Sequence, residues 1–230
     1  GRYDFEPRYN GLFNDPNQMA FWVLSSCAIY LYISGNGFKK ITVYFLALFL
    51  ILLTMSRSAS IGFLMLTLGL IFSQKGDLNK RIFVFIGTLV LFGSLSYFLY
   101  NLGVFDSIAL RFMEGLDQRD SQVEGRGLFS FLDYPQYLIF GAGQGAHWLY
   151  NPTGNEIHST WLGILFYYGI IGISLFLIFL YQIFKKLSLS NKMILLGPML
   201  YGFTTYSART IIFWFLLAAF LLFSNNNKDE

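Results

Sequence analysis

The chain has 230 residues, of which 55% are hydrophobic and only 13% are charged, and its mean hydropathy is +0.51. Soluble domains carry roughly 25% charged residues, so this composition excludes an ordinary water-soluble globule. The 26 Phe and 15 Tyr exclude a disordered chain, and a single cysteine, Cys27, excludes a disulfide framework within the chain. The formal net charge of +3 is small, and in a membrane protein the side on which charges lie matters more than their sum.

Uncharged apolar runs of spanning or near-spanning length recur along the chain. A helix needs about 20 apolar residues to cross a hydrocarbon core of about 30 Å. The runs predict seven transmembrane helices, at residues 18–33, 41–55, 61–72, 82–100, 160–184, 193–206 and 210–223. The second and third runs are short, so we expect their helices to extend into flanking residues or to form a close hairpin around Ser56-Arg57-Ser58. The alternative is that they form a single core helix of the kind found in soluble proteins. The expected fold class is therefore all-α, a polytopic transmembrane helix bundle of about seven spans.

The order of the runs predicts five regions. They are an external segment (1–17), four transmembrane helices (18–100), a large external loop (101–159), three transmembrane helices (160–224) and a cytoplasmic tail (225–230). A loop of this length is expected to be functional. Its stretches 128–132 and 137–140 can bury apolar surface, and residues 108–116 are expected to form a short helix at the membrane interface. Because the chain starts with Gly1, we expect that an amino-terminal part precedes it.

The charged residues of the connecting loops fall into two sets that alternate along the seven runs. One set holds all eight Lys and Arg81; the other holds the remaining seven Arg and ten of the acidic residues. Cytoplasmic loops carry an excess of Lys and Arg, so the amino end is predicted to be external and the carboxyl end cytoplasmic. The external cations are then guanidinium groups alone, which suit bidentate binding of phosphate; chance and interfacial snorkelling are the alternative.

The external ends of the odd-numbered helices are helix amino termini, which favour anions. Asn14-Asp15-Pro16 predicts a capped start for the first helix, and Ser58 and Ser60 are candidate caps of the third, just after Arg57. His158 lies at the start of the fifth helix, where imidazolium is disfavoured and a neutral ring can take a proton; an ordinary capping histidine is the alternative. His147 has no such placement and is interpreted as loop structure.

Other kinds of site have little support in the sequence. There is no His and Cys spacing for zinc and no EF-hand loop, and Gly141-Ala142-Gly143-Gln144-Gly145 lacks the Lys and Ser/Thr of a phosphate-binding loop, so it is predicted to be a tight turn. We therefore expect no metal and no cofactor. No ionisable residue lies deep within an apolar run, which argues against a proton-coupled transporter or an ion channel.

Four ordered motifs resemble those of the O-antigen ligase and polysaccharide polymerase superfamily of bacterial envelope enzymes. They are Arg8-Tyr9-Asn10-Gly11-Leu12-Phe13-Asn14-Asp15-Pro16-Asn17; Ser56-Arg57-Ser58-Ala59; Gly125-Arg126 with Gly141-Ala142-Gly143-Gln144-Gly145; and Glu156-Ile157-His158-Ser159-Thr160-Trp161-Leu162 with Gly169-Ile170-Ile171-Gly172. The resemblance covers about residues 8 to 180. Ser159 departs from it, because the family usually has Asn there. Family members usually have more spans than seven, in line with a carboxy-terminal portion.

The resemblance implies a fold similar to that of C-type glycosyltransferases and a multi-pass enzyme in the bacterial plasma (inner) membrane. The implied reaction, at the outer face, transfers a glycan from a polyprenyl diphosphate carrier without metal or nucleotide sugar. The implied partners are the lipid-linked glycan, membrane lipid and a chain-length-regulating membrane protein, with no nucleic acid. The preferred function is polymerisation of repeat units into O-antigen or capsular polysaccharide. The alternative is an O-antigen ligase that transfers the glycan to lipid A core. A further alternative is a flippase or exporter that breaks no bond.

The candidate site residues fall into three groups by their expected role. Cations would hold the diphosphate and stabilise its departing charge: Arg8, Arg57, Arg126 and Arg209. A base would take the proton of the acceptor hydroxyl, and His158 is the candidate, with Glu124 and Glu156 as alternatives that could instead contact sugars. Three aromatic residues could stack on sugar faces or belong to an interfacial belt: Trp148, Tyr150 and Trp161.

Overall fold

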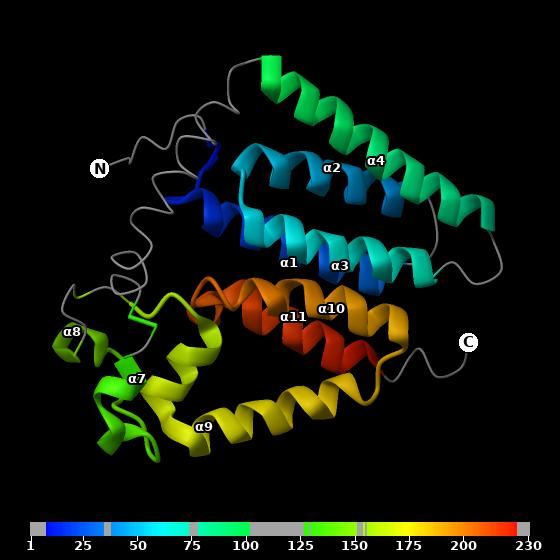
Figure 1. Ribbon diagram of the computed structural model, residues 1–230. Helices are drawn as coiled ribbons and strands as arrows, with labels where there is room; N and C mark the ends of the chain where they lie inside the picture. Colours follow the sequence, from blue (N-terminus) through cyan, green and yellow to red (C-terminus); the bar gives the residue numbers. More distant parts are fainter. Residues whose placement is uncertain are drawn as a thin grey trace. The chain divides into compact units, whose positions relative to one another are not determined.

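Helices form at each of the seven predicted apolar runs (Figure 1). The computed structural model describes residues 8–34, 38–73, 78–101, 127–128, 130–150, 154 and 156–224. Within these ranges the secondary structure is helical and contains no strand, which confirms the all-α prediction. The predicted helix at 108–116 lies outside the described residues.

The chain divides into two units. Unit 1 comprises Gly1–Ser107, Lys186–Tyr201 and Thr210–Glu230, and unit 2 comprises Ile108–Lys185 and Gly202–Arg209. The helices of unit 1 are α1 (Pro16–Ile33), α2 (Phe38–Thr54), α3 (Arg57–Ser73), α4 (Leu78–Asn101), α10 (Leu189–Tyr201) and α11 (Ile211–Leu222). Those of unit 2 are α7 (Ser130–Asp133), the 3₁₀ turn η1 (Pro135–Tyr137), α8 (His147–Tyr150), α9 (Thr160–Phe184) and the 3₁₀ turn η2 (Ser207–Arg209).

Only one helix in the described part of the chain, α9, is both long and apolar enough to cross a membrane unaided. This assignment rests on length and composition alone, and it is weak evidence of membrane association. Helices α3 and α11 are apolar but shorter, at 17 and 12 residues. The seven-span bundle therefore stays a prediction.

Small residues let α3 and α10 of unit 1 pack closely. A Cβ atom on Gly62 would lie 2.8 Å from the carbonyl oxygen of Gly197, and one on Gly69 would lie 2.9 Å from that of Ser190. The Ser190 hydroxyl donates to the Gly69 carbonyl at 2.7 Å. Glycine and serine at such positions allow two helix backbones to approach, as they do in helix pairs within membranes.

Polar and aromatic pairs join the remaining helices of unit 1. The Tyr44 hydroxyl of α2 hydrogen bonds with Thr67 of α3 at 2.7 Å and with Thr88 of α4 at 2.9 Å. The ring of Tyr32 in α1 stacks on that of Phe220 in α11, with centroids 4.0 Å apart. Tyr44 is buried, so these hydrogen bonds satisfy a hydroxyl that water does not reach.

The α2–α3 connection has only two residues, Met55 and Ser56, so the chain turns tightly slightly before the predicted position, and Arg57 and Ser58 belong to α3. Both helices also extend into flanking residues, as the short runs predict. Met55 takes a φ of 50°, a left-handed conformation that reverses the chain direction. The predicted caps of α3 are wrong: the helix begins at Arg57, and the Ser60 hydroxyl donates back to the Ser56 carbonyl at 3.1 Å. A serine in the first turn bonds in this way because the carbonyl four residues earlier lies within its reach.

Helix α9 is broken at Gly169, whose φ of 67° and ψ of −171° are not helical (Figure 1). The glycine-rich segment before α8 packs against this break. The predicted tight turn is present, since Gly141, Gly143 and Gly145 all have positive φ. The prediction that residues 137–140 bury apolar surface is only partly right, because Ile139 and Phe140 are 58% and 80% exposed.

Candidate functional site

His158 lies immediately before the first turn of α9. Ser159 is the residue that caps the helix: its φ is −153°, and its hydroxyl accepts from the amide of Leu162 at 3.4 Å. Ser159 is buried whereas His158 is exposed, so the alternating direction of extended backbone sends the imidazole outward. The alternative of a capping histidine is therefore not what the local geometry shows.

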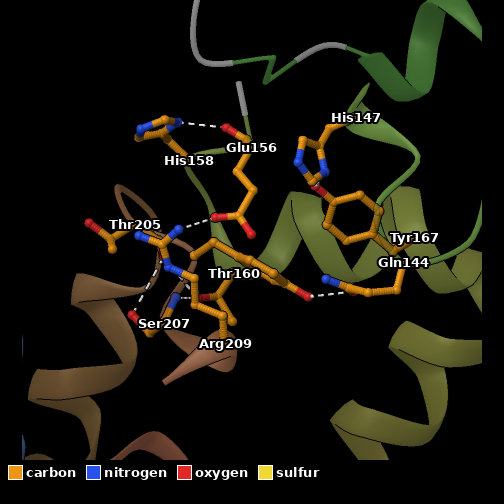
Figure 2. A network of polar contacts seen from close by, with 10 residues as sticks. Gln144, His147, Glu156, His158, Thr160, Tyr167, Thr205, Ser207 and Arg209 are labelled. Carbon is orange, nitrogen blue, oxygen red and sulfur yellow. Dashed lines mark hydrogen bonds and ion pairs between the residues drawn. The ribbon is translucent and has the colours of Figure 1, made fainter. Parts of the chain in front are cut away.

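The imidazole of His158 is oriented by the backbone beside it. Its Nδ1 lies 2.6 Å from the carbonyl oxygen of Glu156 (Figure 2). A carbonyl oxygen only accepts, so Nδ1 carries the hydrogen and, in the neutral ring, Nε2 holds the lone pair. The exposed ring thus presents a nitrogen that can take a proton, which is the chemical requirement for a general base.

The side chain of Glu156 is engaged separately from its carbonyl. Its Oε2 forms an ion pair with Nη1 of Arg209, which ends the turn η2 (Figure 2). The side chain of Arg209 is 43% exposed and that of Glu156 is 22% exposed. Glu156 therefore contacts the base candidate His158 through its carbonyl and the cation candidate Arg209 through its carboxylate. The carboxylate pairs with a guanidinium group that an anionic ligand could also bind.

Thr160 holds the segment that carries Arg209 against the start of α9. Its amide donates to the Gly202 carbonyl at 2.7 Å, and its hydroxyl donates to the Thr205 carbonyl at 2.8 Å. The same hydroxyl accepts from the amide of Ser207 at 2.7 Å. Thr160 is 1% exposed, so these bonds are shielded from water. They explain why α10 ends at Tyr201, five residues earlier than the apolar run predicts.

A second polar group surrounds Tyr167 in the first half of α9. The Tyr167 hydroxyl hydrogen bonds with Nδ1 of His147 at 2.9 Å, and His147 is 5% exposed. Figure 2 shows the His147 ring directed at the hydroxyl of Tyr167. His147 is the first residue of the short helix α8, so the prediction of loop structure is wrong, and its buried bond to Tyr167 gives it a structural role.

Gln144 connects the glycine-rich turn to two tyrosines. Its Oε1 accepts from the hydroxyl of Tyr168 at 3.0 Å and from that of Tyr206 at 3.3 Å. Both tyrosine hydroxyls are donors here, because the amide oxygen of Gln144 can only accept. The turn is thereby fixed to both α9 and the segment after α10.

The three aromatic candidates have different surroundings. Trp148 is 74% exposed, so its ring is accessible. The Tyr150 hydroxyl is 2.6 Å from that of Tyr137, and this hydrogen bond raises the pKa of Tyr150. Trp161 packs between Phe176 and Phe203, and its indole nitrogen is buried without a partner in the described part of the chain. Of the three, Trp148 offers the most accessible surface for a sugar.

Arg8 bonds to the end of α2, and Arg57 begins α3 after the two-residue connection in unit 1. Nε of Arg8 donates to the carbonyl of Thr54, the last residue of α2, at 3.0 Å, and its Nη2 donates to Asn17 at 2.9 Å. Arg57 is exposed at the first position of α3. The predicted start of α1 is confirmed, because Asp15 accepts from the amide of Asn17 at 2.7 Å and Pro16 opens the helix. Arg8 thus has a structural role, and its role in binding a diphosphate stays a prediction.

Two predicted site residues, Arg126 and Glu124, lie outside the described residues. In the part of the chain that is described, no group of three or more His, Cys, Asp or Glu side chains could hold a metal ion. Sequence reasoning missed Thr160, Gln144 and Tyr206. Their residue types carry no signal by themselves, because their importance comes from partners far away in the chain.

Comparison with family models, curated proteins and solved structures finds no match for this chain. The family resemblance therefore stands on the four motifs alone.

Proposed function

We propose that the chain is part of a multi-pass glycosyltransferase of the bacterial plasma membrane. It would polymerise polyprenyl-diphosphate-linked oligosaccharide repeat units into O-antigen or capsular polysaccharide at the outer face. The observation that carries the proposal is the hydrogen bond between Nδ1 of His158 and the Glu156 carbonyl, which leaves Nε2 as the basic nitrogen of an exposed ring. This ring stands at the start of α9, a helix long and apolar enough to cross a membrane.

The chemistry needs one base and several cations. Nε2 of His158 takes the proton of an acceptor hydroxyl while the hydroxyl oxygen bonds to C1 of the donor sugar. The bond between C1 and the diphosphate oxygen breaks, and the diphosphate leaves with the electron pair. Direct displacement inverts the anomeric centre. Because the leaving group is already good, the enzyme chiefly has to stabilise its charge, and no metal is required for this.

The cations are assigned from their charge and geometry. Arg8, Arg57, Arg126 and Arg209 are the candidates for binding the diphosphate, since a guanidinium group donates two parallel hydrogen bonds to phosphate oxygens. Arg209 is supported by its place beside Glu156, two residues from His158. Trp148, with its exposed ring, is the candidate for stacking on a sugar.

Two other functions use the same residues. An O-antigen ligase would differ only in its acceptor, a lipid A core in place of another carrier-linked chain. A flippase or exporter would bind the lipid diphosphate through the arginines but would have no use for a base at His158. The oriented imidazole favours an enzyme over the exporter.

The test uses the full-length protein in membranes with a carrier-linked repeat unit, and product size is followed on a gel with and without a chelator. We expect a ladder of products that persists in chelator and is lost in His158→Ala. Gln182→Ala is the control, because Gln182 is exposed near the far end of α9 and should keep the ladder. A single transfer seen only with lipid A core would identify the ligase, and normal product from His158→Ala would refute the catalytic role of His158.

A further inference from the structure

The break in α9 at Gly169 frees backbone groups that a second segment of unit 2 then satisfies. The amides of Ala142 and Gly143 donate to the carbonyls of Phe166 and Tyr167 at 2.8 and 3.0 Å. In the other direction, the amides of Ile170 and Ile171 donate to the carbonyls of Leu138 and Ile139 at 2.7 and 3.4 Å. Residues 138–143 therefore lie directly against the middle of α9 and replace the hydrogen bonds that the break removes.

This pairing is what a water-free environment demands. In hydrocarbon no water can bond to an unpaired N–H or C=O group, so non-helical backbone at that depth is tolerated only where protein groups cover it. The four hydrogen bonds supply protein partners on both sides of Gly169.

The side chains of residues 138–143 are apolar where they are exposed. Ile139 is 58% exposed and Phe140 is 80% exposed, and no charged residue occurs from position 134 to position 146. Just beyond the break, α9 presents a similar surface, with Ile170 at 52% and Ile171 at 46% exposure. Because the amide of Ile171 bonds to the carbonyl of Ile139, the two exposed apolar segments lie next to each other.

The position of Gly169 along α9 sets its depth. Lys185 and Lys186 are exposed at the carboxyl end of the helix, where charged side chains mark the edge of the hydrocarbon core. The stretch from Gly169 to Phe184 rises about 22 Å at 1.5 Å per residue. A core of about 30 Å extends about 8 Å beyond that point, so the break lies within the hydrocarbon region of a helix that spans it.

We propose that residues 138–143 are a re-entrant segment that enters the membrane beside α9, with Ile139 and Phe140 in contact with lipid acyl chains. The inference rests on the part of the proposed function that places α9 across a membrane, and it is independent of the glycosyl-transfer chemistry. It assigns the glycine-rich segment to the bilayer, whereas its sequence alone predicts a turn in an external loop.

The test uses spin labels on single cysteines in full-length protein in which Cys27, the one native cysteine of this chain, is changed to alanine. Labels at Phe140→Cys and Ile139→Cys probe the segment, and a label at Ile178→Cys, 56% exposed on α9, reports the lipid surface. A label at Asp133→Cys is the aqueous control, because Asp133 is exposed and a carboxylate is costly in hydrocarbon. In proteoliposomes, collisions with oxygen report lipid and collisions with a water-soluble nickel chelate report water.

We expect the labels at positions 139 and 140 to have an oxygen-to-nickel collision ratio like that at position 178 and well above that at position 133. A ratio at 139 and 140 equal to that at 133 would overturn the re-entrant segment, while lipid exposure at 178 would leave the membrane location of α9 intact. Low collision rates with both reagents would mean that protein covers the segment and would also overturn the inference. Nickel accessibility at 178 would instead contradict the membrane location of α9.

Discussion

Gly169 lies so close to Gly141 that a Cβ atom on Gly169 would fall 2.7 Å from the amide nitrogen of Gly141. Gly141 is restricted in turn by the residues just before Gly169, since a Cβ atom on it would overlap the carbonyl group of Tyr167. Both residues also have positive φ, of 67° and 84°. Only glycine meets both demands, so these two positions hold the turn and the broken helix together.

The first prediction compares two glycine-to-alanine variants, so that the cost of a strained backbone is separated from the cost of steric overlap at the contact between Gly141 and Gly169. Gly169→Ala places a Cβ atom 2.2 Å from the Ile139 carbonyl oxygen in a backbone region that is essentially restricted to glycine. We expect it to lower the free energy of unfolding by more than about 3 kcal/mol. Gly143→Ala is the matched control, because its φ is 88° but no atom lies within 4 Å of the added Cβ, so it should cost only about 1–2 kcal/mol.

Thermal or denaturant unfolding of the purified variants in detergent measures these differences. Equal destabilisation by Gly169→Ala and Gly143→Ala would show that the close contact between Gly141 and Gly169 contributes nothing beyond conformational strain.

The second prediction concerns competition for Arg209. Its ion pair with Glu156 is partly exposed, and such pairs contribute about 0.2–1 kcal/mol. A diphosphate that binds Arg209 must displace the carboxylate, so Glu156→Gln should lower the KM for the lipid-linked donor about two- to fivefold. Arg209→Lys keeps the charge but loses the planar fork and should raise this KM about tenfold.

Steady-state kinetics with varied donor concentration distinguishes the roles. The backbone carbonyl that orients His158 is retained in Glu156→Gln, so kcat should change little. A large fall in kcat with an unchanged KM would contradict competition and would assign the Glu156 carboxylate a direct part in the reaction.

The third prediction concerns the hydroxyl of Thr160, which accepts from the Ser207 amide and donates to the Thr205 carbonyl. Thr160→Val keeps the shape of the side chain but removes both bonds at a site that is 1% exposed. Losing such partners in a buried place costs about 1–3 kcal/mol of stability, so we expect a lower unfolding midpoint. We also expect the segment that carries Arg209 to be less firmly positioned.

Thr160→Ser retains the hydroxyl and is the control. It should keep most of the stability and the donor KM of the unchanged protein, whereas Thr160→Val should impair both. A Thr160→Val variant as stable as the unchanged protein, or a greater loss in Thr160→Ser than in Thr160→Val, would contradict the role of the hydroxyl.

The positions of the helices follow from local features of the sequence. Apolar runs, the cap at Asp15 and the proline at position 16 act within one or two turns, and the structure forms α1 where they predict it. The α2–α3 hairpin is likewise local, because two residues connect the helices. The end of α10 is not local: the apolar run continues to residue 206, but Thr160 draws residues 202–207 into bonds that a helix would not allow.

The candidate site is predictable only in part for the same reason. His158 is predicted as the candidate base because it lies just before an apolar helix. The structure adds the orientation of its ring, which a carbonyl two residues away holds by a hydrogen bond. The ion pair of Glu156 with Arg209 joins residues 53 positions apart, and no spacing rule in the sequence indicates it. Arg126 and Glu124 stay predictions, since they lie outside the described residues.

The sequence by itself determined that this protein is helical and apolar, because helix formation and burial depend on residue types within a few turns. Only the tertiary structure decided that the glycine-rich segment closes a break in α9, and that the carboxylate of Glu156 binds Arg209. Hydrogen bonds and close contacts between distant segments depend on how the chain folds back on itself. A glycine in the sequence indicates that another backbone segment can approach it closely, but the sequence does not show which segment does so.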